Sequence, residues 1–234
     1  MIIGFSTGCL YKSHDRLSPS TIKLFRKAGC NAIEVMFYST SNTSKFLKLK
    51  KSDFEGFEYI SVHAPIYRNG EKDKYLKALG AICEIHSKID FDTVVLHPDS
   101  FDDFGIFKSF NLPFAVENMD KHKNSCKDAK DLKRVFEKFD VPMVFDINHC
   151  LSNDSSLKLA GDLLRTFHSR IKEIHLSGLD TFHDPLFKTK QEMIMDAIPD
   201  IGCPVIIESG LDGVEEISLE LEYIKRYLSS HIKK

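Results

Sequence analysis

Eight short apolar runs recur along the chain, and most of them are followed by a stretch with helical periodicity. Such short runs cannot form helices of their own and are typical of buried strands. Strands that alternate with helices in this way form parallel sheets. The expected strands are Ile2–Phe5, Ala32–Met36, Tyr59–His63, Thr93–His97, Phe114–Glu117, Met143–Asp146, Ile171–Leu176 and Val205–Glu208.

The number of these units predicts the fold. Eight strand–helix units in 234 residues indicate a single (β/α)8 TIM barrel, an α/β fold whose active site lies at the C-terminal ends of the strands. A doubly wound open sheet is the alternative, but no G-x-G-x-x-G motif follows the first strand. No low-complexity linker divides the chain. We therefore expect residues 1–234 to form one domain.

The composition excludes several classes of protein. The six cysteines include no C-x-x-C pair, which argues against zinc knuckles and a disulfide scaffold and is typical of a reducing compartment. A net charge of −2 gives no overall attraction to nucleic acid, although a local basic patch is compatible with it. No signal peptide or membrane-length apolar run is present. We expect a soluble cytoplasmic protein that does not contact a membrane, and nothing indicates a protein partner.

The residues that close the strands are the main functional signal. Six of the eight strands carry His, Asp or Glu at or near their ends, and in a barrel these ends meet at one mouth. Acids and imidazoles crowded together need a cation between them. We therefore predict a metal site made of His63, His97, Glu117, Asp146, His149, His175, His183 and Glu208.

The types of ligand indicate the type of metal. Imidazole and carboxylate without thiolate suit zinc, manganese or iron, whereas calcium and magnesium prefer shells of oxygen. So many ligands exceed what a single ion can use. Two or three ions bridged by a carboxylate would use them all.

Seven short motifs surround these residues, and they occur in order between Ile3 and Glu208. They are Ser61-Val-His-Ala-Pro65, Val94-Val-Leu-His-Pro98, Val116-Glu-Asn118, Phe145-Asp-Ile-Asn-His149, Glu173-Ile-His-Leu176, His183-Asp-Pro-Leu186 and Ile206-Ile-Glu208. As a set they resemble the xylose-isomerase-like TIM-barrel superfamily. That superfamily joins endonuclease IV with sugar and sugar-phosphate isomerases and epimerases.

The resemblance implies a division of the ligands among metal ions. One group resembles the single-metal site of the isomerases, and a second resembles part of the trinuclear zinc site of endonuclease IV. Glu117 belongs to both groups and would bridge two ions. The first group is Glu117, Asp146, His175 and Glu208, and the second is His63, His97 and Glu117.

A third ion is implied by the same resemblance. His149 and His183 would hold it together with an acid that the family places two residues before the second histidine. This chain has Thr181 at that position, so Asp180 or Asp184 would have to supply the carboxylate.

The favoured hypothesis is phosphoester hydrolysis of the type carried out at abasic (AP) sites, with two or three zinc ions. The substrate would be damaged DNA or a small phosphorylated molecule. Glu117 would bridge the ions and orient the reacting groups. Tyr67 and Arg68 would stack on or pair with a nucleotide, and Lys188 would belong to a basic rim.

The alternative hypothesis is isomerisation or epimerisation of a sugar or sugar phosphate with one manganese or magnesium ion. Glu117 and Glu208 would then shuttle a proton, and His149 would contact a substrate oxygen. Phe37, Tyr38 and Phe187 would be walls of a closed pocket. A barrel that binds a ligand without catalysis is the non-enzymatic hypothesis. The full set of histidines favours the hydrolase.

Overall fold

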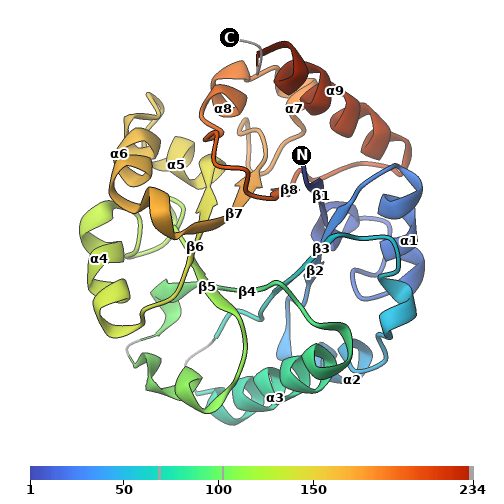
Figure 1. Ribbon diagram of the computed structural model, residues 1–234, viewed down its shortest axis with the longest axis vertical. Coiled ribbons are helices and arrows are strands. Elements are labelled where there is room, and N and C mark those ends of the chain that lie inside the picture. The colour runs from blue at the N-terminus through green and yellow to red at the C-terminus, as the bar shows by residue number, and fades with distance from the viewer. Residues whose placement is uncertain (68–69, 102, 232–234) are drawn as a thin grey trace.

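The computed structural model describes residues 1–67, 70–101 and 103–231. Within these residues eight parallel strands close into a barrel, and each strand pairs with its neighbours in chain order. Figure 1 shows the strands at the centre and the helices in a ring around them. The predicted (β/α)8 barrel is confirmed. The strands are β1 (Ile3–Ser6), β2 (Ala32–Met36), β3 (Tyr59–His63), β4 (Thr93–Leu96), β5 (Phe114–Glu117), β6 (Met143–Asp146), β7 (Ile171–Leu176) and β8 (Val205–Ile207).

The α-helices of the described residues occupy the connections between strands and the stretch that follows β8. They are α1 (Pro19–Lys27), α2 (Thr43–Phe46), α3 (Lys72–Ile89), α4 (Ala129–Lys138), α5 (Ile147–Asn153), α6 (Lys158–Phe167), α7 (Leu186–Thr189), α8 (Glu192–Asp196) and α9 (Glu215–His231). Short 3₁₀ turns are found at Thr7–Leu10, Thr40–Asn42, Lys51–Asp53, Pro98–Ser100, Phe104–Ser109 and His168–Arg170. None of the helices in the described part of the chain is long and apolar enough to span a membrane.

The first residues of two helices can be compared with the capping signals in the sequence. Helix α1 begins as the Ser-Pro pair predicts, because Ser18 is its N-cap and Pro19 its first residue. The sequence predicts another helix over Cys126–Phe139, capped by Ser125. That start is wrong, because Cys126 has a φ of 62° and the side chain of Asp128 caps α4 instead.

Most of the apolar core lies between the barrel and its ring of helices. Stacked aromatic pairs fill this layer, such as Phe37 with Phe46 at 4.5 Å between ring centroids. The inside of the barrel contains small apolar clusters, one of which is made of Val95, Ala115 and Val144 on β4, β5 and β6. Packing on both faces explains why the strand sequences read as continuous apolar runs.

Candidate metal centre

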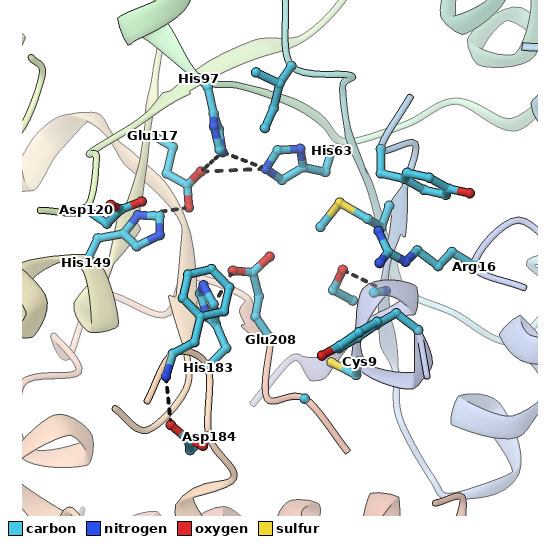
Figure 2. Close-up of a pocket in the computed structure, with 18 of the residues that line it drawn as sticks. Cys9, Arg16, His63, His97, Glu117, Asp120, His149, His183, Asp184 and Glu208 are labelled. Atoms are coloured by element: carbon cyan, nitrogen blue, oxygen red, sulfur yellow. Dashed lines mark hydrogen bonds and ion pairs between the residues drawn. The ribbon is translucent and has the colours of Figure 1, made fainter. Parts of the chain in front are cut away.

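The C-terminal ends of the strands surround a cavity of about 610 Å³. Figure 2 shows imidazoles and carboxylates pointing into it from several strands. Two of the predicted ligands, Asp146 and His175, are fully buried behind the cavity wall. The other six line the cavity directly: His63, His97, Glu117, His149, His183 and Glu208.

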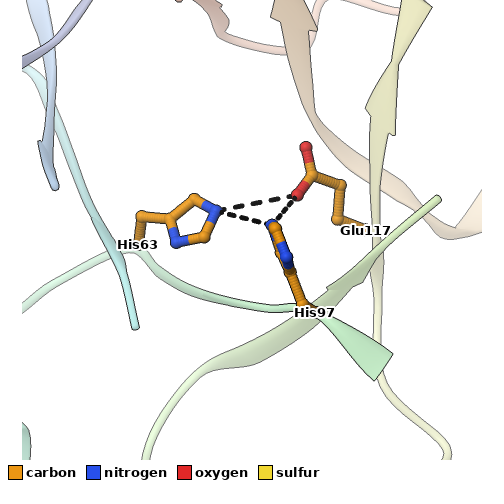
Figure 3. A group of neighbouring side chains, drawn as sticks. All are labelled: His63, His97 and Glu117. Carbon is orange, nitrogen blue, oxygen red and sulfur yellow. Dashed lines mark hydrogen bonds and ion pairs between the residues drawn. The ribbon is translucent and has the colours of Figure 1, made fainter. Parts of the chain in front are cut away.

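The first group of potential ligands comprises His63, His97 and Glu117, from the ends of β3, β4 and β5. Figure 3 shows the two imidazole rings and the carboxylate facing one another. The Nε2 atoms of the histidines lie 3.0 Å apart, and Glu117 Oε2 lies 3.0 Å from His97 Nε2 and 3.7 Å from His63 Nε2. The ring of His63 is oriented by its Nδ1, which lies 3.0 Å from the carbonyl oxygen of Ala64. That bond leaves Nε2 turned toward a ligand.

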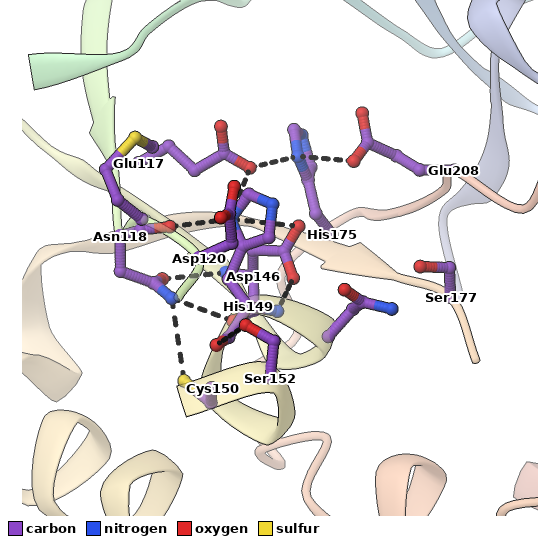
Figure 4. A network of polar contacts seen from close by, with 12 residues as sticks. Glu117, Asn118, Asp120, Asp146, His149, Cys150, Ser152, His175, Ser177 and Glu208 are labelled. Atoms are coloured by element: carbon purple, nitrogen blue, oxygen red, sulfur yellow. Dashed lines mark hydrogen bonds and ion pairs between the residues drawn. The ribbon is translucent and has the colours of Figure 1, made fainter. Parts of the chain in front are cut away.

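The second group comprises Glu117, Asp146, His175 and Glu208. Glu117 Oε1 lies 2.9 Å from His175 Nδ1, and Glu208 Oε2 lies 3.5 Å from the same nitrogen (Figure 4). Glu117 therefore faces the two groups with different oxygens, Oε2 toward His97 and Oε1 toward His175. This is the arrangement of a carboxylate that bridges two metal ions.

The local structure around Asp146 fixes its position. Its side chain caps α5 by accepting the backbone N–H of His149 at 2.7 Å. The buried side chain of Asn118 accepts the backbone N–H of Asp146 and donates to its carbonyl oxygen, both at 2.9 Å. Figure 4 shows this contact beside the ligands. Asp146 therefore joins β6 to α5 and is held from β5 as well.

The pKa values of the buried ligands indicate a site suited to a cation. Burial raises the pKa of Asp146 to about 6, and burial together with Glu34 and Glu117 raises that of Glu208 to about 8. Burial lowers the pKa of His63, but Glu117 and Glu34 outweigh it and bring the value to about 9. At neutral pH Glu208 and His63 would therefore hold protons in the metal-free protein, and divalent cations bound to the same side chains would replace them. The donor set of imidazole nitrogens and carboxylate oxygens fits zinc or a similar ion.

His149 and His183 face each other at the cavity wall, with ring centroids 5.7 Å apart. Nδ1 of His149 lies 2.8 Å from the carbonyl oxygen of Asn118, and Nδ1 of His183 lies 2.8 Å from Ser177 Oγ. Burial and the neighbouring His149 lower the pKa of His183 to about 3, so its ring is neutral. The two imidazoles are positioned like ligands.

Asp184, one of the two acids expected for a third ion, lines the same cavity but does not converge with these histidines. Among the described residues, no group of converging ligand atoms combines His149 and His183 with a carboxylate. Asp184 accepts backbone N–H groups from Asp180, Thr181 and Phe182 and so stabilises the turn before it. Asp180 is exposed and does not line the cavity. The third ion stays a prediction.

Two of the three expected substrate-binding residues, Tyr67 and Lys188, do not line the cavity. Tyr67 packs between Phe101 and Tyr75, with ring centroids 5.3 and 5.4 Å away, and does not line the cavity. Lys188 forms ion pairs with two acids, Asp212 at 2.8 Å and Glu216 at 2.6 Å. Arg68 lies outside the described residues.

Of the aromatic walls expected for an isomerase, Tyr38 lines the cavity, whereas Phe37 is buried in the core. Phe187 is not part of the cavity lining.

The rim of the cavity contains residues that the sequence did not single out. The guanidinium carbon of Arg16 lies 4.3 Å from the ring centroid of Tyr38 and 5.3 Å from that of Tyr11. Phe182, in the loop after β7, also lines the cavity, and its ring is exposed. The signal that could have found them is position, because loops that follow barrel strands carry the substrate contacts.

Comparisons with known proteins place the fold. No protein-family model matches the chain, and no curated protein matches it in sequence. Solved structures do match. Endonuclease IV from Thermus thermophilus superposes with a TM-score of 0.68 at 15% identity, covering 91% of this chain and 94% of the other. The chain shares the TIM-barrel fold of this structure.

Other solved structures with this fold are proteins of different kinds. D-psicose 3-epimerase from Clostridium cellulolyticum matches with a TM-score of 0.63 at 14% identity, covering 97% of this chain and 99% of the other. A further Thermus thermophilus protein, whose crystal was soaked with ZnCl2, matches with a TM-score of 0.63 at 13% identity, covering 98% and 99%. At these identities the likeness concerns the fold, and the chemistry has to be argued from the cavity.

Proposed function

We propose that this protein is a divalent-metal-dependent phosphoester hydrolase with two zinc ions at the mouth of the barrel. One observation carries the proposal: Glu117 turns one oxygen toward His97 and the other toward His175, so that the two ligand groups share it. A single-metal isomerase has no need of His63 and His97 in this position. The fold likeness to endonuclease IV supports the same choice.

When bound, a pair of metal ions lowers the pKa of water and stabilises the attacking and leaving oxygens of an in-line displacement. The chain's own residues would do the rest. Glu117 holds the two groups at a fixed separation. Glu208 borders the cavity as a ligand, and the carboxylate oxygen that the ion leaves free would hold or move a proton of the attacking water. His149 presents its ring to the same cavity and would contact the substrate or a further ion.

Arg16 gives the cavity a substrate-binding cation in this proposal. Its side chain is half-buried between two tyrosine rings, and no ion pair with an acid is found for it among the described residues. A guanidinium held in place by aromatic faces is well suited to a phosphate oxygen. The substrate would be a small phosphorylated molecule or damaged DNA whose strand enters between the rim aromatics.

The second candidate is a sugar or sugar-phosphate isomerase with one manganese or magnesium ion on Glu117, Asp146, His175 and Glu208. The placement of Glu117 and Glu208 favours it, because their carboxylates face the same nitrogen of His175 from 2.9 and 3.5 Å. Two carboxylates so placed would serve as a proton-shuttling pair. The epimerases of this fold support this candidate.

We further propose a single-domain protein that works in the cytoplasm. The six cysteines are free, and four of them are buried. Free thiols are typical of reducing compartments. Their number and state thus support this location.

Metal content and activity of a His97→Ala variant test the hydrolase. After zinc loading and removal of excess metal, elemental analysis of the wild type should give at least two ions per chain. The variant should lose one ion at the mouth and at least about a hundredfold of its phosphoesterase activity on an abasic-site oligonucleotide, since one metal supplies several kcal/mol of transition-state stabilisation.

The matched control is His168→Ala, because His168 is exposed and precedes β7 at the opposite end of the barrel. This variant should keep both its zinc and its activity. One exchangeable manganese or magnesium per chain, together with epimerisation of a ketose and no phosphoesterase activity, would refute the hydrolase and support the isomerase.

A further inference from the structure

The inside of the barrel is polar beneath one side of the cavity. On β4, β5 and β6 the interior is filled by a small apolar cluster, as TIM-barrel interiors usually are. On β2, β3 and β7 it contains Glu34, Ser61 and Glu173, each 0% exposed. Two acids buried inside a barrel carry a large desolvation cost unless they are paired. Their presence therefore needs a physical reason.

Glu173 is firmly held. Its Oε1 accepts hydrogen bonds from Nε2 of His175 at 2.9 Å and from Ser61 Oγ at 3.1 Å, and its Oε2 accepts from the hydroxyl of Tyr59 at 2.7 Å. His175 and Glu173 are two residues apart on β7 and so point to the same side of the sheet. The ring of His175 therefore faces the mouth with Nδ1 and the interior with Nε2.

Glu34 is held less firmly, by one ion pair and no hydrogen bond among the described residues. Its Oε2 lies 3.5 Å from Nε2 of His175, and neither of its oxygens accepts a hydrogen bond from the described residues. Ligand atoms of Glu34, Glu173 and His175 nevertheless all lie within 4.8 Å of one another. A fully buried carboxylate without a hydrogen bond thus points at an imidazole nitrogen and at a second carboxylate.

A cation between Glu34 and Glu173 is needed more strongly when a metal ion is bound at the mouth, because that ion changes the charge of His175. A metal ion on Nδ1 of His175 displaces the proton from that nitrogen, so the ring is no longer an imidazolium. Glu34 and Glu173 would then face each other with only neutral donors around them. In a medium of low dielectric constant such a pair of acids repels strongly. A divalent cation between them removes the repulsion.

We propose that a further divalent metal ion binds inside the barrel, held by Glu34, Glu173 and Nε2 of His175. The ring of His175 then joins the two ions as an imidazolate: Nδ1 releases its proton to solvent when the mouth ion binds, and Nε2 releases its own when the interior ion binds. One imidazole and two carboxylates suit zinc, manganese or iron. The path from the cavity to this interior site is short, because two neighbours of Glu34 line the cavity. They are Ser6, its partner on β1, and Met36, the next inward residue of β2.

Metal counting combined with anomalous diffraction tests the interior ion. Wild-type protein loaded with zinc and freed of excess metal should contain three ions per chain, with an anomalous peak between Glu34 and Glu173. Glu34→Gln keeps the shape of the side chain but removes its charge. This variant should contain two ions and lose the interior peak while keeping those at the mouth. Glu137→Gln, at an exposed position on α4, is the matched control and should still contain three.

Two results would overturn the inference. One is a wild-type crystal with zinc at the mouth and no anomalous peak between Glu34 and Glu173; this measurement decides the matter even where Glu34→Gln fails to fold. The other is an unchanged zinc count in Glu34→Gln. The proposed function fails separately, because it predicts peaks beside His97 that the interior ion does not require. His97→Ala should lose one of those and keep the interior peak.

Discussion

At the scale of single residues, the metal centre depends on side chains that make two contacts each. Glu117 joins the two ligand groups, and His175 is bonded through both ring nitrogens, 2.9 Å from Glu117 on one side and 2.9 Å from Glu173 on the other. Because such residues are shared, replacing one of them should disturb more than one ion. Glu208 and His63 contact fewer partners. Their pKa values therefore show most simply how the metal-free site affects the stability of the protein.

The metal-free protein should lose stability as the pH rises from 6.5 to 9. The pKa of Glu208 rises from 4.5 to about 8 on folding, and that of His63 rises from 6.5 to about 9. A group whose pKa is raised on folding stabilises the protein below its unfolded pKa and loses this contribution as the pH passes its folded pKa. Both groups act in the same direction over this window. Thermal unfolding in EDTA should therefore show a falling Tm.

Glu208→Gln isolates one of the two contributions. Without the carboxyl group, the fall in Tm between pH 6.5 and 8 should be shallower than in the wild type, and the remaining fall up to pH 9 should belong mainly to His63. Saturating zinc should reverse the trend, because metal binding releases the same protons. A Tm of the metal-free wild type that stays level or rises over this window would contradict the assignment of these pKa values.

At the scale of elements, the strands and the residues that meet at the mouth of the barrel could be predicted from the sequence, but helix α5 could not. Most strand ends were predictable to within a residue, because six of the eight apolar runs carry a titratable residue at or near their ends. Helix α5 was not, because five consecutive residues from Ile147 to Leu151 are buried and leave no polar face to give a helical period. Glu34 lies inside an apolar run, and nothing local shows that it faces the barrel interior. Arg16 depends on a loop conformation that no periodicity encodes.

Asn118→Ala should separate β6 from its support on β5. The amide of Asn118 makes two buried hydrogen bonds to the backbone of Asp146, both 2.9 Å long. Their loss removes the side-chain acceptor of a buried N–H and one donor to a buried C=O, which should cost about 2 kcal/mol of unfolding free energy. Asp146 should also move, and zinc affinity should fall by about tenfold to a hundredfold. Urea unfolding and a competitive chelator titration measure the two effects.

Asn31→Ala is the matched control for this element. Its side chain also holds a strand, because Oδ1 accepts the backbone N–H of Ile3 at 2.8 Å, but it lies at the start of β1 and β2, away from the cavity. This variant should lose stability and keep its zinc affinity. If Asn118→Ala binds zinc as tightly as the wild type, Asn118 is a structural residue without influence on the metal ligands.

At the scale of the whole molecule, the cavity exists only when the barrel is closed. Strand β1 pairs with β2 on one side and with β8 on the other, so the first and last strands meet (Figure 1). The ligands come from β3 to β8 and from the residues just after them. Any change that keeps β1 from its place should open the barrel and spread the ligands apart.

Gly4→Ala should prevent this closure. A Cβ atom at Gly4 would lie 1.7 Å from the carbonyl oxygen of Ala32 on β2, and backbone cannot yield that much without breaking the pairing. We expect a loss of more than about 3 kcal/mol in unfolding free energy, measured by urea unfolding in EDTA, and loss of zinc binding with the fold. Gly80→Ala is the control of opposite sign, because Gly80 is exposed in α3 with open space around it. That variant should gain about 0.5–1 kcal/mol. Equal stability of the two variants would contradict the close approach of β1 and β2.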